Sequence, residues 1–342
     1  MENKRGVLIS VIVPVFQGES TIARCVNSIL ASSVKELEVI VVDDGSTDRT
    51  SEIVEEIAQK DERVLLITKG NEGVSRARNV GLSHARGVCI GFVDADDFVD
   101  SNMYETMARQ LADGCDMVIC GSYHCNIAGE MIDKKMRPIQ GYRRKCPLDA
   151  LQTVIYERTT MAVWSKLFKS SKIKNEDGSL KIAFREDQCR YEDFIFVCDY
   201  LSECTEEISL LSQRLYYYTR SEGGLSHQPY TAAMMKQNLQ PLLNLKKKIT
   251  DTSFTAPELF YTENFVRQWY IQGMEYSRKE LTQRSEDRIL LTEEAGRYLK
   301  VYLQSPKVHI LKKAAAWLMV KHINAASAAT VLMRALRRVV SN

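Results

Sequence analysis

The fold of this chain is decided by the stretch Val88-Cys89-Ile90-Gly91-Phe92-Val93-Asp94-Ala95-Asp96-Asp97, an apolar run that ends at three carboxylates. Such a β-branched run is typical of a buried strand. On extended backbone Asp94 and Asp96 project to the same side, where they can share a divalent cation, or a cation and a hydroxyl group. Ligands of open α/β sheets bind beyond the carboxyl ends of strands, where these acids fall. The alternative is a solvated turn that caps the next helix through Asp97 or Ser101, and for an isolated acidic pair this is the commoner case.

Strand-like and helical segments alternate around this stretch. The pattern predicts strands at residues 7–14, 37–42, 64–68, 88–93 and 116–121, and helices at residues 21–31, 49–59, 74–85 and 101–113. Short connections between them favour right-handed crossovers, and so a doubly wound, mostly parallel α/β sheet with helices on both faces. Further on, residues 208–211 and 215–219 are predicted as two strands joined around Ser212-Gln213, and residues from 231 onward as a helical C-terminal region.

The bulk composition excludes several classes of protein. The chain has 342 residues, of which 45% are hydrophobic, and a net charge of +2, which gives no sign of nucleic-acid binding. Its nine cysteines contain no C-x-x-C pair and are typical of small buried residues in a reducing compartment. The apolar segment of residues 7–15 is too short to span a membrane and has no cleavage site after it. We expect a cytoplasmic protein.

The C-terminal end is basic. From Arg297 onward there are nine Lys or Arg residues and no Asp or Glu. In residues 325–340 a helical wheel separates apolar residues from Arg334, Arg337 and Arg338. Such a helix suits the anionic surface at the inner face of a membrane, but packing of its apolar stripe against the domain or a second subunit is equally consistent with the pattern.

Polar groups follow two further predicted strands. Pro14-Val15-Phe16-Gln17 and Glu19 follow the first strand, and Asp43-Asp44-Gly45-Ser46 follow the second. Parallel strands put their carboxyl ends at one edge, so these groups are expected to converge with Asp94. Asp44 is suited to accept a hydrogen bond from a base N–H. It also fits a tight turn with Gly45 at positive φ, and the two interpretations are compatible.

Three more segments carry candidate groups whose commoner interpretation is structural. Asn71, Gly73 and Arg78 lie in a G-x-x-G helix opening that matches neither a dinucleotide-binding fingerprint nor a P-loop, although its amides and arginines suit phosphate or ribose. Glu192-Asp193 begin an apolar helix, where first-turn acids are common, yet one of them can serve as a general base if the segment folds over the sheet edge. His227 is a lone loop histidine, more often a surface residue than a ligand.

Together these segments resemble the inverting family 2 glycosyltransferases, which have the GT-A fold and build bacterial polysaccharides. The matching motifs occur in the family's order and are Ser10–Val15, Val41–Asp48, Asn71–Gly81, Gly91–Asp97, Trp164–Phe168, Tyr191–Asp193, Leu215–Thr219 and Leu225–His227. The resemblance covers roughly residues 7–228. It implies a glycosyltransferase domain at 1–228, with a nucleotide-sugar half at about 1–121 and an acceptor half at about 122–228. Residues 229–342 match no motif.

The resemblance implies a role for each matched residue. Asp44 would bind the nucleobase, in a nucleotide-binding set with Pro14, Val15, Phe16, Glu19, Asn71, Gly73, Arg78, Asp94 and Ala95. Asp94 would lie near the ribose, Asp96 would hold Mn²⁺ or Mg²⁺, and His227 would meet the pyrophosphate or the metal. Asp193 would be the general base, with Glu192 beside it. One departure is Phe16-Gln17, where the family usually has Tyr-Asn, and a second is the polar run 186–190, where apolar residues are usual.

The function implied is transfer of a hexose or N-acetylhexosamine from a nucleotide sugar, expected to be UDP-linked, to a hydroxyl of a cell-surface glycan or lipid-linked glycan. A sugar nucleotidyltransferase is the alternative enzyme, but it needs a phosphate loop that residues 17–20 do not supply. A non-catalytic binding module on the same fold is the other alternative, disfavoured because Asp96 and Asp193 are both present. Contact with a membrane and a homodimer remain open.

Overall fold

The computed structural model describes residues 8–132, 141–144, 162–186 and 192–220, together with the helical pairs 303–304 and 313–314. The chain divides into two compact units, Met1–His227 and Gln228–Asn342. The predicted helical character of residues 229–342 and the basic end of the chain fall almost entirely outside the described residues and stay predictions. Among the described residues, no helix combines the length and the apolar character that crossing a membrane requires.

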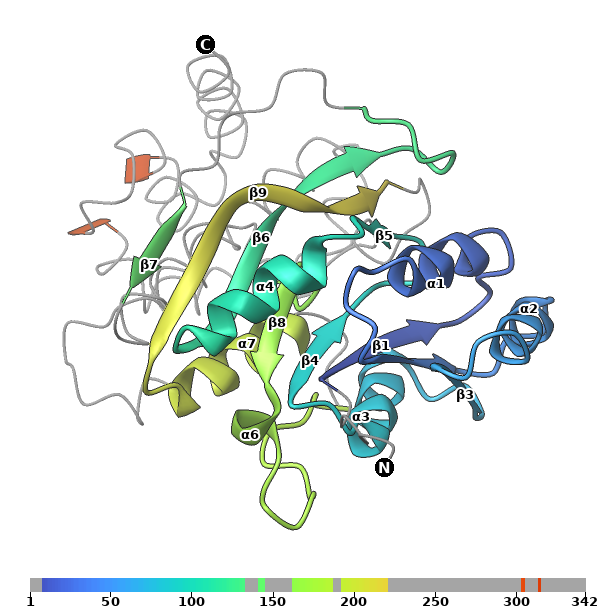
Figure 1. The fold of residues 1–342 in the computed structure, drawn as a ribbon, viewed down its shortest axis with the longest axis horizontal. Helices are drawn as coiled ribbons and strands as arrows, with labels where there is room; N and C mark the ends of the chain where they lie inside the picture. The colour runs from blue at the N-terminus through green and yellow to red at the C-terminus, as the bar shows by residue number, and fades with distance from the viewer. Residues whose placement is uncertain are drawn as a thin grey trace, which may run out of the picture. The chain divides into compact units, whose positions relative to one another are not determined.

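Alternating strands and helices make up the N-terminal part of the first unit, as the sequence predicts (Figure 1). In chain order the elements are β1 (Ile9–Val15), α1 (Ile22–Leu30), β2 (Leu37–Asp43), α2 (Thr50–Ala58), β3 (Val64–Thr68), α3 (Val74–His84), β4 (Cys89–Phe92), β5 (Phe98–Val99), α4 (Met103–Ala112) and β6 (Cys115–Cys125). The later elements are β7 (Tyr142–Arg144), β8 (Lys166–Lys169), α6 (Ser170–Ile173), α7 (Glu192–Glu203) and β9 (Glu207–Thr219).

The described strands form one mixed sheet in the order β3-β2-β1-β4-β8-β6-β9-β5, with β7 also paired to β9. Its first half is parallel, because β2 and β4 both run alongside β1, and β3 runs alongside β2. The strand β8 then enters antiparallel between β4 and β6. The carboxyl ends of β1, β2 and β4 therefore meet at one edge, and β8 delivers residues from the second half of the domain beside them.

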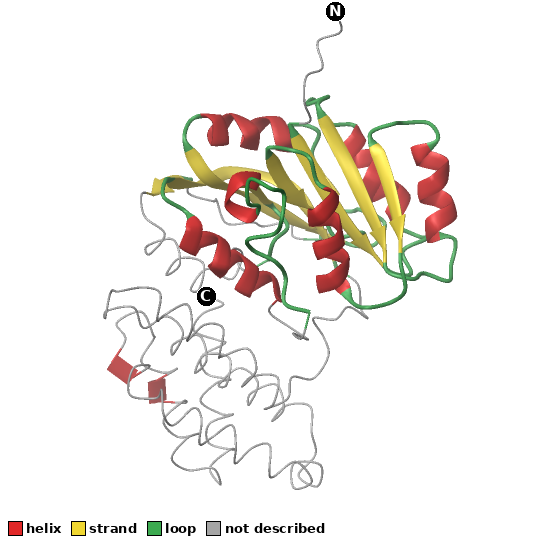
Figure 2. Ribbon diagram, turned by 90° about the horizontal axis from the view of Figure 1, so that it is seen from below, coloured by secondary structure: helices red, strands yellow, loops and turns green. Residues whose placement is uncertain are grey.

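Helices cover both faces of the sheet (Figure 2). Successive side chains of β1 point to opposite faces of the sheet, and both faces are apolar. On one face Val11 and Val13 belong to a buried cluster that includes residues of α1, α2 and α4. Ile12 points to the opposite face, where α3 packs so closely that a Cβ on Gly81 would lie 2.5 Å from it. On this face Phe196 of α7 also packs edge-on against Phe92 of β4, with ring centroids 5.7 Å apart. The predicted doubly wound α/β fold is confirmed.

One strand differs from the prediction. Residues 208–211 and 215–219 belong to a single 13-residue strand, β9, which Figure 1 shows as a long bent arrow. Ser212 and Gln213, expected to form a connection, are exposed residues within it. They lie beside an irregularity in the pairing of β6 with β9, at Gly121. Such a bulge bends a strand without ending it, so polar residues are tolerated there.

Candidate functional site

The loops that follow β1 and β2 are joined by side chains of the first loop. Gln17, at φ +54°, accepts the backbone N–H of Thr47 at 3.1 Å and donates to the Thr47 hydroxyl at 2.9 Å. The Glu19 carboxylate accepts the backbone N–H of Arg49 at 3.0 Å. Phe16, the residue before Gln17, is 51% exposed, although it is a large apolar residue. An aromatic ring held at the exit of a central strand is suited to stacking on a flat ligand.

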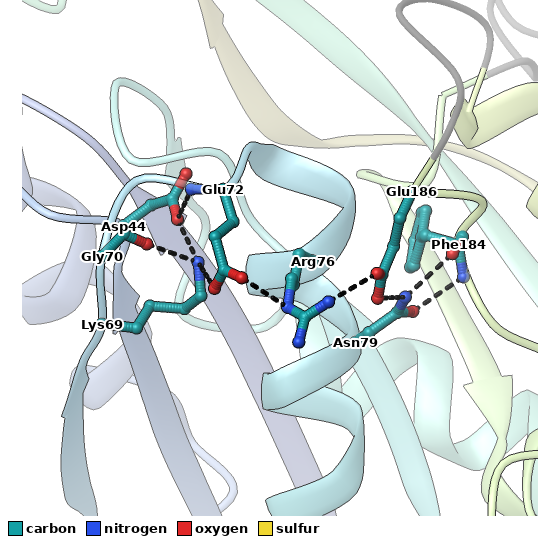
Figure 3. Close-up of polar contacts among 8 residues, drawn as sticks. All are labelled: Asp44, Lys69, Gly70, Glu72, Arg76, Asn79, Phe184 and Glu186. Carbon is teal, nitrogen blue, oxygen red and sulfur yellow. Dashed lines mark hydrogen bonds and ion pairs between the residues drawn. The ribbon is translucent and has the colours of Figure 1, made fainter.

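Asp44 organises the loop before α3. Its carboxylate accepts the backbone N–H groups of Glu72 at 3.0 Å and Gly73 at 2.7 Å. Lys69 donates to it as well, and Figure 3 shows the bonds from Glu72 and Lys69. Gly73 has φ +95°, a conformation that glycine adopts without strain. The side chain of Asp44 is 6% exposed, so these bonds are shielded from water. Asp44 thus fixes the loop that contains Asn71, and its predicted contact with a nucleobase stays a prediction.

Arg78 of α3 is the centre of the site. Its guanidinium donates to Asp193 at 2.7 Å and to Glu192 at 3.3 Å through Nη1, and to Asp94 at 3.1 Å through Nη2. The side chain is 4% exposed and lies over the ring of Phe184, 5.2 Å from its centroid. Burial alone would lower the pKa of Arg78, yet the three carboxylates hold that pKa above its ordinary value. One buried cation therefore joins the end of β4 to the start of α7.

The Asp193 carboxylate is bound at both oxygens. Oδ1 accepts from Arg78, and Oδ2 accepts the backbone N–H of Val163 at 3.2 Å. Burial raises the pKa of Asp193 to about 7, with Arg78 opposing that rise and Glu192 and Asp94 adding to it. A carboxylate with a pKa near neutrality is suited to general base catalysis. The structure therefore brings together Asp193, Glu192, Asp94 and Arg78, four of the predicted site residues.

Asp97 holds the acidic loop that follows β4, residues 94–97, in place. Asp97 is fully buried and accepts the Tyr216 hydroxyl at 2.6 Å and the backbone N–H of Thr219 at 2.6 Å. Burial of the Asp96 side chain, together with the charge of Asp94, raises its pKa to about 6. An oxygen ligand beside a second carboxylate fits a divalent cation.

The remaining predicted residues vary in how much the structure says of them. Pro14 and Val15 are buried in β1, and Ala95 lies in the acidic loop. His227, predicted as a metal ligand or pyrophosphate contact, lies outside the described residues. Within the described part of the chain no group of three His, Cys, Asp or Glu side chains is arranged to hold a metal ion. The metal site at Asp96 and His227 thus stays a prediction.

Sequence reasoning missed residues that position this site. Asn79 of α3 donates its amide to the carbonyl oxygen of Phe184 and accepts the backbone N–H of Phe184, both at 2.8 Å (Figure 3). This pair of bonds fastens the segment that leads toward α7. Arg24 of α1 donates to the carbonyl oxygen of Asp96 at 2.8 Å and to the Thr219 hydroxyl at 3.2 Å. An asparagine or arginine inside a helix carries no sequence signal for such a role.

The fold and the gathered carboxylates are typical of nucleotide-binding enzymes of the α/β class. The family model for glycosyl transferase family 2 matches residues 10–173. A glycosyltransferase of Haemophilus influenzae is 35% identical over 180 residues, which cover 50% of this chain and 68% of that protein. This chain belongs to glycosyl transferase family 2, and the predicted family is confirmed.

Other relatives are longer than the matched region. The glycosyltransferase EpsJ of Bacillus subtilis is 31% identical over 229 residues, or 66% of this chain and 65% of EpsJ. GlyA of Streptococcus pneumoniae is 29% identical over 64% of this chain but only 31% of its own length. The chain therefore spans less than two thirds of these two proteins.

A solved structure shares the fold. Residues 1–349 of S. aureus TarS superpose with a TM-score of 0.65 at 21% identity, covering 97% of this chain and 91% of that one. TarS has also been solved in complex with UDP-GlcNAc and with UDP. The similarity confirms the predicted GT-A architecture.

Proposed function

We propose that this protein is an inverting glycosyltransferase that moves a hexose or N-acetylhexosamine from a UDP-sugar to a hydroxyl of a cell-surface polysaccharide or lipid-linked glycan. The observation that carries the proposal is Arg78, which holds Asp94 from the strand-end loop and Asp193 from α7 within one buried cluster. Family membership supports sugar transfer, and the UDP-GlcNAc complex of TarS supports a UDP-linked donor. The same membership argues against a sugar nucleotidyltransferase.

The donor side is assigned to the edge where β1, β2 and β4 end. Phe16 is exposed at that edge and suits stacking on a uracil ring, and the loop fixed by Asp44 contains Asn71. Asp94 is assigned to the ribose. Asp96 would hold Mn²⁺ or Mg²⁺, together with His227, and such a cation when bound neutralises charge on the diphosphate leaving group.

Asp193 is assigned the role of general base. It takes the proton of the acceptor hydroxyl while that oxygen forms a bond to the anomeric carbon and the bond from that carbon to the diphosphate breaks. Attack from the face opposite the leaving group inverts the configuration. The carboxylate is already oriented by Arg78 and by the Val163 N–H, so no rotation of the side chain is needed before proton transfer.

The test is the Asp193→Asn variant. UDP release is measured with a panel of UDP-sugars and Mn²⁺, and UDP affinity is measured by calorimetry. Asp193→Asn is expected to bind UDP within a fewfold of wild type and to lose about 10²–10⁴-fold in turnover. The matched control is Asp199→Asn, since Asp199 lies on the same helix and pairs at 3.9 Å with Arg185 instead of Arg78. Near-normal turnover of Asp193→Asn would remove the base assignment.

A further inference from the structure

One peptide group lies between a buried lysine and the Asp193 carboxylate. Lys166 Nζ donates a hydrogen bond to the carbonyl oxygen of Ala162. The backbone N–H of Val163 donates to Asp193 Oδ2 at 3.2 Å. The carbonyl of Ala162 and the N–H of Val163 belong to the same planar peptide bond, and in a trans peptide they point in opposite directions. An ammonium thus binds one end of this peptide and the Asp193 carboxylate binds the other.

The turn containing this peptide is held at both ends. Ser165 has φ +59°, a left-handed conformation that a residue other than glycine adopts only when its surroundings impose it. The carbonyl oxygen of Ser165 accepts the N–H of Cys120 on β6 at 3.0 Å, so the turn is fastened to the sheet. Lys166, the next residue, begins β8 and reaches back four positions to Ala162. The peptide that binds Asp193 is therefore set in place by the lysine and by the strand behind it.

A lysine at position 166 costs folding free energy that an apolar residue would not, if its role is only to pack. Its side chain is completely buried in a strand between β4 and β6, where an apolar residue would need no partner. The ionisable groups that act on it are Asp193 from α7 and Cys120 from β6. Burial lowers the pKa of Lys166 to about 7, and Asp193 and Cys120 oppose that lowering. A lysine kept here at this cost is expected to act on the carboxylate nearby.

We propose that Lys166 is a positioning residue for Asp193, acting through the Ala162–Val163 peptide group. By binding the carbonyl end it keeps the N–H end aimed at Oδ2, while Arg78 fixes Oδ1. The two donors together determine the plane of the carboxylate, and so the direction from which it accepts a proton. Below the lowered pKa of Lys166, about 7, the positive charge of this lysine also polarises the peptide and favours the ionised carboxylate. This inference rests on the proposed role of Asp193 as the base.

The experiment compares Lys166→Met and Lys166→Gln with wild type in the full chain. UDP release from the UDP-sugar that wild type consumes is followed from pH 6 to 9, with UDP affinity and Tm measured in parallel. We expect kcat to fall about 10- to 100-fold in Lys166→Met, with donor KM and UDP affinity unchanged. Arg78, Glu192 and Asp94 still face Asp193 in the variant, so the lysine is the one charge that changes, and its hydrogen bond to the Ala162 carbonyl is lost with it. The midpoint at which kcat rises with pH should then move to higher pH.

Two features separate positioning from a structural role. Replacing a buried ammonium with methionine should leave Tm unchanged or raise it. A positioning role therefore predicts that kcat falls while Tm does not. Lys166→Gln keeps a hydrogen-bond donor without the charge, and it is expected to recover part of kcat while retaining the shifted midpoint. It also serves if Lys166→Met does not fold. The control on the same strand is Lys169→Met, which removes an ion pair with Asp116 at 3.1 Å and should lower Tm but leave the pH profile unchanged.

The possible results are distinct. An unchanged pH profile and kcat in folded Lys166 variants would overturn the positioning role, and so would a fall in kcat that merely follows Tm with the midpoint unmoved. If Asp193→Asn turns over normally, the base assignment itself fails, whatever the lysine variants do. If Asp193→Asn is inactive and the Lys166 variants behave like wild type, only the lysine inference fails.

Discussion

Replacing Arg78 with methionine should destabilise the domain strongly, and by an amount that depends on pH. The guanidinium is 4% exposed and bonds three carboxylates at 2.7, 3.1 and 3.3 Å. Methionine keeps the length and the apolar stem but leaves Asp94, Glu192 and Asp193 close together with no cation. Removing one partner of a buried ionic cluster typically costs about 3–5 kcal/mol. At about 2–4 °C per kcal/mol for a domain of this size, Tm should fall by about 6–20 °C at pH 8.

The pH dependence follows from the carboxylates. Burial raises the pKa of Asp193 to about 7 while Arg78 opposes that rise, so loss of Arg78 should raise this pKa further. A folded-state pKa above the unfolded value means that the folded chain binds more protons, and its stability falls as pH rises through that range. The deficit of Arg78→Met should therefore be smaller at pH 5, where Asp193 takes up a proton, than at pH 8.

The free energy of unfolding of wild type and of Arg78→Met is measured by urea denaturation at pH 5 and pH 8, with Arg76→Met as the control. Arg76 lies on the same helix and also pairs with two acids, Glu72 at 3.1 Å and Glu186 at 2.8 Å (Figure 3). It is 47% exposed, and exposed pairs contribute only about 0–1 kcal/mol. Equal losses for the two arginine variants, or a larger deficit for Arg78→Met at pH 5 than at pH 8, would refute the reasoning.

Two further substitutions test the packing around the site. Gly81→Ala should lower the free energy of unfolding by about 1–3 kcal/mol, because the new Cβ would lie 2.5 Å from the buried Ile12 side chain. Gly70→Ala, which meets nothing within 4 Å, should change it much less, and a similar loss at both glycines would count against the clash. Tyr216→Phe should lower the free energy of unfolding by about 1–3 kcal/mol, because the buried Asp97 carboxylate loses the tyrosine hydroxyl that donates to it at 2.6 Å. Unchanged urea midpoints for Tyr216→Phe would show that this hydrogen bond contributes nothing net.

The parallel half of the sheet was predictable because each strand is an apolar run and each helix has apolar residues at helical spacing. The position of β8 was not, since it pairs with β4 across more than 70 residues of chain and no local pattern specifies that partner. The sequence predicted two strands in place of β9 because residues 212–213 are polar. These residues lie at a bulge within the single strand. Local propensity describes elements well, whereas pairing between distant segments depends on the whole core.

The motifs pointed to four residues that the structure brings together, but the hydrogen bonds that connect them were not predictable. Arg78 was expected beside the nucleotide, and its bond to Asp193, 115 positions away, has no counterpart in the sequence. The second oxygen of Asp193 is bound by a main-chain N–H at Val163, and a backbone donor leaves no trace in residue type. The predicted contact of Asp44 with a nucleobase stays a prediction, and its carboxylate also accepts backbone N–H groups of the next loop, which the motif did not indicate. Polar residues that hold loops and those that hold ligands look alike in a sequence.

Because Arg78 divides a single positive charge among three acids, the two sides of the cluster are thermodynamically linked. A ligand that draws Asp94 away removes a negative charge that raises the pKa of Asp193, and so weakens the hold of Asp193 on a proton. Protonation of Asp193, in turn, removes a negative charge that repels Asp94. Linkage of this kind is reciprocal, so occupancy at the end of β4 and ionisation at the start of α7 must shift each other by the same free energy. Communication across the site therefore requires no movement of helices or domains.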